Sequence, residues 1–90
     1  MKYYEEVIER ICRVIEERLY VCVETTEGVA GYELIVTSEH DDNLTKTYKV
    51  HYRDLEYSDP RDYDSPVLRI ANNIISQFAS DYKDSMYRPN

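Results

Sequence analysis

The chain has 90 residues, 18 of them acidic and 11 basic, which gives a formal net charge of −7 at pH 7. A domain of this size buries a modest core and leaves little volume for a deep, enclosed active site. Direct binding of nucleic acid is also disfavoured, because it needs several Lys and Arg residues on one face to neutralise phosphates.

The first predicted element is an amphipathic helix over residues 3–18. Apolar side chains recur there at spacings of three and four residues, which places them on one face. The other face carries Glu and Arg, with Glu6/Arg10 and Glu9/Arg13 in the favourable order for ion pairs four residues apart. These frequent charges do not fit an apolar secretory segment, and no stretch has the length of a membrane span, so we expect a cytoplasmic protein without membrane contact.

The apolar period then changes from 3.6 to 2, which predicts strands over residues 19–25, 31–38 and 45–52. Gly28 and Gly31 can adopt positive φ in the first turn, and the short connections favour an antiparallel meander. The expected inner face holds Leu19, Val21, Val23, Tyr32, Leu34, Val36, Tyr48, Val50 and Tyr52. The expected open face holds Tyr20, Cys22, Glu24, Glu33, Ile35, Thr37, Lys49 and His51.

Residues 53–64 have neither period and predict an exposed acidic loop. A second amphipathic helix is predicted over residues 66–85, with Ser65 as the N-cap and Pro66 at the first helical position. The whole chain, residues 1–90, is therefore expected to form one α+β domain in the order α-β-β-β-α. In this arrangement two helices pack on one face of a three-stranded antiparallel sheet.

Two acidic blocks carry most of the negative charge. The first acidic block, residues 24–42, has six carboxylates and no Lys or Arg, and the second acidic block, residues 54–64, has five carboxylates against Arg61. Localised acidic charge suits a basic protein partner. Tyr57 and Tyr63 lie inside the second block as candidate anchors, although their rings could instead cover the base of their own loop. The predicted partner-binding residues are Glu24, Glu27, Glu33, Glu39, Asp41, Asp42, Asp54, Glu56, Tyr57, Asp59, Asp62, Tyr63 and Asp64.

The α-β-β-β-α order is also that of double-stranded RNA-binding domains. Those domains place a basic cluster at the start of their second helix, where it contacts phosphates. The corresponding residues 62–68 of this chain include Asp62 and Asp64, and only Arg69 lies nearby. The shared element order therefore does not imply double-stranded RNA as a ligand.

No group of residues predicts catalysis or a metal site. Asp59, Asp62 and Asp64 lack the glycine and the final glutamate of a calcium-binding loop, and His40 with Asp41 and Asp42 is a weak metal signal. No nucleophile, base and orienting group can be assigned from their spacing. We therefore expect a protein that is not an enzyme and that needs no cofactor or metal.

In size, acidity and element order the chain resembles some small phage-encoded anti-CRISPR proteins, which occupy a DNA-binding groove by imitating the charge of DNA. This resemblance implies a viral inhibitor of a nucleic-acid-binding enzyme, whose basic surface the acidic blocks would occupy. The alternative is a structural or regulatory homo-oligomer. There the open face with Tyr20, Cys22 and Ile35, or an edge strand, would pair with a second copy, and the acidic blocks would serve solubility.

Overall fold

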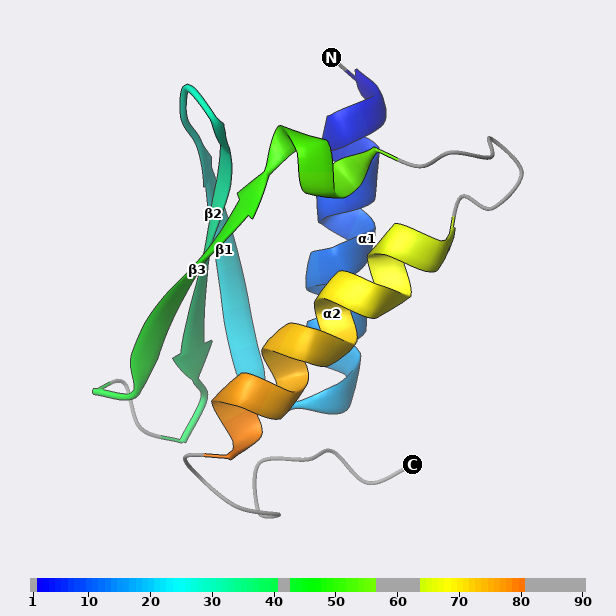
Figure 1. Ribbon diagram of the computed structural model, residues 1–90. Helices are drawn as coiled ribbons and strands as arrows, with labels where there is room; N and C mark the ends of the chain where they lie inside the picture. Colours follow the sequence, from blue (N-terminus) through cyan, green and yellow to red (C-terminus); the bar gives the residue numbers. More distant parts are fainter. Residues whose placement is uncertain (1, 41–42, 57–63, 81–90) are drawn as a thin grey trace.

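The computed structural model describes residues 2–40, 43–56 and 64–80, and of residues 2, 3, 64 and 65 the backbone alone. The elements are α1 (Lys2–Arg18), β1 (Val21–Glu27), β2 (Gly31–Ser38), β3 (Thr45–His51), the 3-10 helix η1 (Tyr52–Leu55) and α2 (Asp64–Ala79). β2 is the central strand of an antiparallel sheet, and both α-helices lie on the same side of it (Figure 1). The predicted α-β-β-β-α order and α+β class are confirmed.

Three predicted strand and loop boundaries are wrong. β1 begins at Val21 rather than at residue 19, because α1 continues to Arg18 and the Leu19 N–H still donates to the Ile15 carbonyl at 3.0 Å. β1 also extends two residues beyond the predicted end, to Glu27. β3 ends at His51, one residue before the predicted end. Residues 53–55 were predicted to begin an irregular loop but belong to η1, whose Leu55 is fully buried in the core.

The bounds of α2 also differ from the predicted 66–85. The helix begins at Asp64, so Ser65 lies within its first turn and is not the N-cap, and Pro66 is its third residue. Proline is tolerated there because the first four N–H groups of a helix have no partner within the helix. The helix ends at Ala79, and residues 81–85 of the prediction lie outside the described residues.

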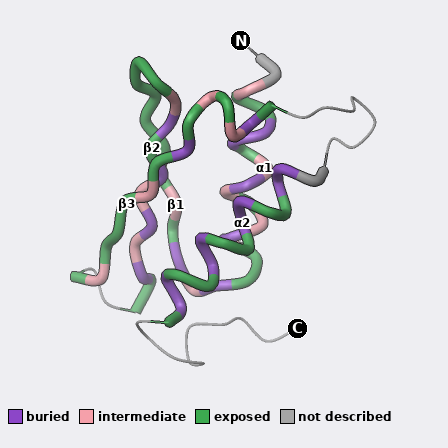
Figure 2. The backbone as a smooth tube through the Cα atoms, viewed as in Figure 1, coloured by how far each residue is buried: buried purple, intermediate pink, exposed green. Residues whose placement is uncertain are grey.

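The hydrophobic core lies between the two α-helices and the inner face of the sheet. Figure 2 shows buried residues on the facing sides of α1, α2 and the strands. Alternate residues of β2 are buried, which gives the period of two that a strand with one covered face requires. The largest fully buried side chains are Ile11, Ile15, Leu19, Leu34, Leu55 and Phe78.

Polar contacts fix α1 against its neighbours. The Glu16 carboxylate accepts a hydrogen bond from the Val23 N–H on the outer edge of β1 at 2.9 Å. The Arg18 guanidinium donates to the Asn72 side chain of α2 at 2.7 Å. α1 therefore holds both the edge of the sheet and the second helix.

The two ends of the sheet carry different connections. The β1–β2 turn, η1 and the start of α1 lie at one end, and the β2–β3 connection lies at the other (Figure 1). At the first end the Tyr52 N–H donates to the Ala30 carbonyl at 3.0 Å, which ties η1 to the turn. At the other end the Glu39 N–H donates to the Tyr20 carbonyl at 2.8 Å. Glu27 of the first acidic block and Asp54 of the second acidic block both lie at the first end.

Candidate functional site

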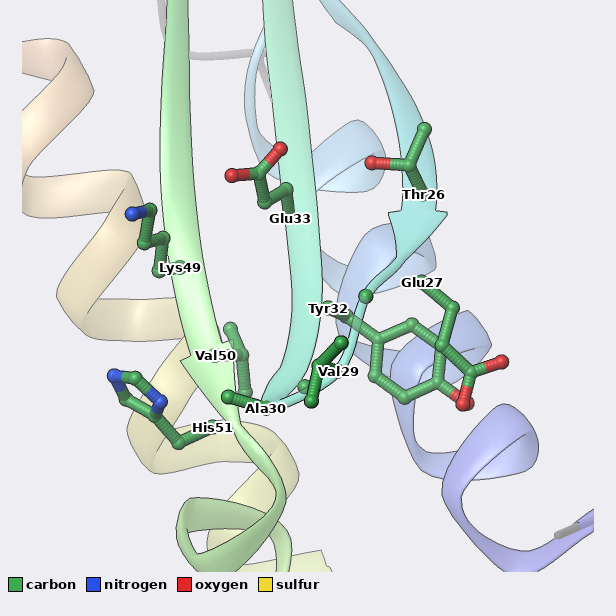
Figure 3. A pocket seen from close by; sticks show the side chains of 11 residues that line it. Thr26, Glu27, Val29, Ala30, Tyr32, Glu33, Lys49, Val50 and His51 are labelled. Carbon is green, nitrogen blue, oxygen red and sulfur yellow. The ribbon is translucent and has the colours of Figure 1, made fainter.

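We use the term hairpin end for residues 26–33 together with residues 49–51 at the end of β3. These residues surround a shallow cavity of about 300 Å³ (Figure 3). At its tip Val29 is fully exposed, although large apolar side chains of the described chain are otherwise mostly covered. Single exposed apolar residues are common on protein surfaces, so Val29 bears on binding only together with the residues around it.

Three tyrosines from three elements pack beside this turn. The rings of Tyr4 in α1 and Tyr52 in η1 are tilted with centroids 5.2 Å apart, and Tyr32 in β2 meets Tyr52 edge to face at 5.8 Å. These are favourable separations for aromatic pairs. The cluster joins the N-terminal part of α1 to the hairpin end, and it was not predicted as part of the binding site.

The Glu27 carboxylate is the acidic centre of this cluster. It accepts a hydrogen bond from the Tyr52 hydroxyl at 2.5 Å, and the same hydroxyl lies 3.3 Å from the Gly28 carbonyl. The Tyr32 side chain extends toward Glu27 (Figure 3). Its hydroxyl is buried and has no hydrogen-bond partner with suitable geometry among the described residues. One carboxylate therefore lies next to two phenols and accepts a hydrogen bond from Tyr52.

The charge of Glu27 also changes the ionisation of both phenols. Its hydrogen bond with Tyr52 is the main cause that raises the pKa of that phenol to about 12. Burial, followed by the nearby charges of Glu27 and Glu5, raises the pKa of Tyr32 above the usual value. Both phenols stay neutral at physiological pH, so the cluster presents a carboxylate on an aromatic base.

Strand pairing explains how Glu27 reaches the tyrosines. β1 pairs with β2 as far as Glu27 opposite Tyr32, so Glu27 lies on the same face as Val21 and Val23. The closing turn depends on Gly31, where a β carbon would lie 2.2 Å from the Val50 carbonyl oxygen. Of the two turn glycines, only Gly31 has a positive φ. The close approach of β2 and β3 at Gly31 therefore requires glycine.

Glu33 and Lys49 lie opposite each other on the open face of the sheet. Glu24 pairs with Ile35, which makes it a diagonal neighbour of Glu33 on that face. The Lys49 side chain extends away from Glu33 (Figure 3). Glu24 and Glu33 therefore present two exposed carboxylates on one surface.

The start of the second acidic block lies next to the hairpin end. Asp54 accepts a hydrogen bond from the His51 N–H at 3.1 Å, and His51 pairs with Gly31. Glu56 is exposed just after η1. The structure therefore brings Glu27, Glu33 and Asp54 to the same end of the sheet, together with Lys49. Arg53 and Glu56 belong to η1 and its C-cap, and η1 lies at that end (Figure 1).

Other predicted residues lie elsewhere. Glu24 lies further along β1, and Glu39 lies at the opposite end of the sheet. The backbone of Asp64 begins α2. The predicted residues that lie outside the described part of the chain are Asp41, Asp42, Tyr57, Asp59, Asp62 and Tyr63.

The described residues also bear on metal and membrane binding. In residues 2–40, 43–56 and 64–80, no three His, Cys, Asp or Glu side chains are grouped as they would be to hold a metal ion. None of the helices in this part of the chain is both long enough and apolar enough to cross a bilayer.

No protein-family model, no curated protein and no solved structure matches this chain.

Proposed function

We propose that this protein is a non-enzymatic binding protein that docks its hairpin end on a basic surface of a protein partner and inhibits it. The observation that carries this proposal is the combination of Glu27 on its tyrosine cluster with the fully exposed Val29. Carboxylates bring the protein to a basic surface and orient it, the apolar tip supplies buried contact area, and the packed rings hold Glu27 in position.

The chemistry of the hairpin end defines the partner surface. Glu27, Glu33, Asp54 and Glu56 require Arg or Lys residues opposite them, and Val29 requires a small apolar depression between those residues. A nucleic-acid-binding site has such basic residues on its surface. We therefore propose a nucleic-acid-binding protein as the partner, in keeping with the resemblance to anti-CRISPR inhibitors.

An affinity capture with matched variants tests this proposal. The immobilised chain is exposed to bacterial lysate, and the bound proteins are identified by mass spectrometry. The hairpin-end variant Glu27→Gln/Glu33→Gln/Glu56→Gln should lose a basic partner that the wild-type chain retains. The control variant Glu9→Gln/Glu17→Gln/Glu39→Gln removes as many carboxylates from other exposed positions and should retain that partner.

Two further readouts separate the parts of the proposal. Double-stranded DNA added to the captured complex should release the partner, because both ligands would occupy the same basic surface. If the partner stayed bound to the immobilised chain in excess DNA, the proposal that the chain occupies a nucleic-acid-binding site of the partner would be contradicted. Equal capture by the wild-type chain and both variants would contradict docking through the hairpin end.

A further inference from the structure

The two edges of the sheet differ in how they are covered. On β1, the outward Val23 N–H is occupied by the Glu16 carboxylate of α1. Next to β3, the Ser38 N–H donates to the Leu44 carbonyl at 2.9 Å. In an antiparallel pair every second residue bonds to the neighbouring strand, so this bond shows which main-chain groups of β3 face β2. Because these positions alternate, the main-chain groups of Thr47 and Lys49 point away from β2. The structure shows no main-chain partner for Thr47 or Lys49 on this side among the described residues.

A groove runs between this edge of β3 and α2. It has a volume of about 380 Å³, which is within the usual range for ligand sites. Its apolar part is formed by Tyr48 of β3 and by Ile70 and Ile74 of α2, and Asn73 and Gln77 add side-chain amides. An outward-facing strand edge above a groove that combines polar side chains with a few apolar ones is an arrangement that can accept an additional strand.

The charges along the groove indicate what kind of strand fits. Lys49 lines it and extends away from Glu33 (Figure 3), and Arg69 lines its other wall. The Arg69 guanidinium donates a hydrogen bond to the Asp54 main-chain carbonyl at 3.3 Å. The acceptor in this bond is a neutral carbonyl, which does not neutralise the charge of Arg69. Asp54 also lies at this end, with its carboxylate hydrogen-bonded to the His51 N–H. A protein with a net charge of −7 thus has two basic side chains beside an open strand edge.

We propose that the β3–α2 groove binds an extended peptide in which acidic and apolar residues alternate. The peptide pairs antiparallel with β3. Its acidic residues lie opposite Thr47 and Lys49 on the open side of the sheet, and its apolar residues point toward Tyr48, Ile70 and Ile74. The groove shares Lys49 and Val50 with the hairpin end, but Tyr48, Ile70 and Ile74 lie outside that end. The proposal concerns this strand edge and does not depend on the proposed function.

Fluorescence anisotropy with a labelled synthetic peptide, Ala-Asp-Val-Glu-Val-Asp, tests the specificity. We expect saturable binding that is at least about tenfold tighter than binding of the same peptide with Lys at its acidic positions. N-methylation of the central Glu should abolish binding, because it removes an N–H that pairs with β3. The absence of saturation at roughly millimolar protein, or equal affinity for the Lys peptide, would overturn the proposal.

Proline substitutions test the strand edge. Thr47→Pro removes only an outward N–H, a position where an edge strand tolerates proline, and it should abolish peptide binding. Thr25→Pro is the matched control, because Thr25 occupies the equivalent outward position on β1. Circular dichroism checks that both variants fold. Lys49→Glu, which leaves the backbone intact, should weaken binding of the acidic peptide at least about tenfold.

Amide NMR spectra and sedimentation complete the test. With bound peptide, the Thr47 and Lys49 amides should shift and exchange more slowly with solvent, while the Thr25 amide should not change. Binding that survives both Thr47→Pro and Lys49→Glu would place the peptide elsewhere and overturn the proposal. Peptide-independent dimerisation that Thr47→Pro abolishes would show that a second copy of the chain occupies this edge instead.

Discussion

At Gly31 the backbone has a φ of +156°, and its neighbours leave no space for a side chain. A β carbon there would lie 2.2 Å from the Val50 carbonyl oxygen and 2.8 Å from the His51 Cα. Both contacts are with the backbone of β3, which cannot move without breaking the strand pairing. The position of the turn relative to β3 thus depends on this one residue.

We expect Gly31→Ala to lower the free energy of unfolding by about 2–4 kcal/mol, because backbone strain and overlap with β3 both contribute. Urea denaturation followed by circular dichroism measures this loss. Gly28→Ala is the control in the same turn, because its β carbon would meet only the Gly31 carbonyl oxygen at 3.9 Å. Equal destabilisation by the two substitutions would contradict the role given to Gly31.

Because of the hydrogen bond between Tyr52 and Glu27, we expect the stability of the fold to fall as the pH becomes strongly alkaline. The pKa of Tyr52 is raised to about 12 in the folded protein, whereas an unfolded tyrosine titrates near pH 10. As the pH rises, the unfolded chain therefore releases this proton before the folded protein does. The stabilisation that the Tyr52–Glu27 hydrogen bond gives the folded state is complete below about pH 10 and is lost as the pH rises to about 12. Urea denaturation across this range should show a smaller loss of stability for Tyr52→Phe than for the wild-type chain. An identical loss in both proteins would mean that Tyr52 titrates normally.

At the scale of elements, one carboxylate joins α1 to the outer edge of β1, in addition to their apolar packing. Glu16 accepts the Val23 N–H, which no strand pairs on that edge within the described structure. We expect Glu16→Ala to cost about 1–2 kcal/mol of folding free energy, since it removes a charge-assisted hydrogen bond. It should also speed hydrogen exchange at the Val23 amide. Glu17→Ala removes the adjacent, exposed carboxylate and should change neither quantity, so matching effects would contradict this role of Glu16.

Periodicity was sufficient to predict the order of the elements and the inner face of β2. It failed at the end of β1, because Thr25, Thr26 and Glu27 are polar and the alternation of apolar residues stops at Val23, although strand pairing continues. Extending the strand by two residues would have placed Glu27 on the inner face. η1 is too short to produce a period, so the buried position of Leu55 could not be predicted.

The candidate site was only partly predictable for a related reason. Its carboxylates were found by their local density in the sequence, which identified Glu27, Glu33, Asp54 and Glu56. The tyrosine cluster was missed because Tyr4, Tyr32 and Tyr52 come from three elements and meet only after tertiary packing. The exposure of Val29 depends in turn on how the closed turn projects beyond η1.

At the scale of the whole molecule, the negative charge is not uniform. Glu27, Glu33, Asp54 and Glu56 gather at one end of the sheet, Glu39 lies at the other, and Lys49 and Arg69 line the groove beside β3. Residues that are close together in one acidic block of the sequence therefore lie at different ends of the sheet, and residues of different blocks lie at the same end. Among the described carboxylates of the two blocks, this arrangement favours an acidic contact surface at the hairpin end over an even layer of charge that would serve solubility alone.

The salt dependence of affinity for the captured partner tests this account most directly. Isothermal titration at increasing salt should show a steep loss of affinity for the wild-type chain and for Glu9→Gln/Glu17→Gln/Glu39→Gln. Glu27→Gln/Glu33→Gln/Glu56→Gln should bind at least about tenfold more weakly at low salt and depend less on salt. The same affinity and the same salt dependence for all three proteins would contradict binding through the hairpin end.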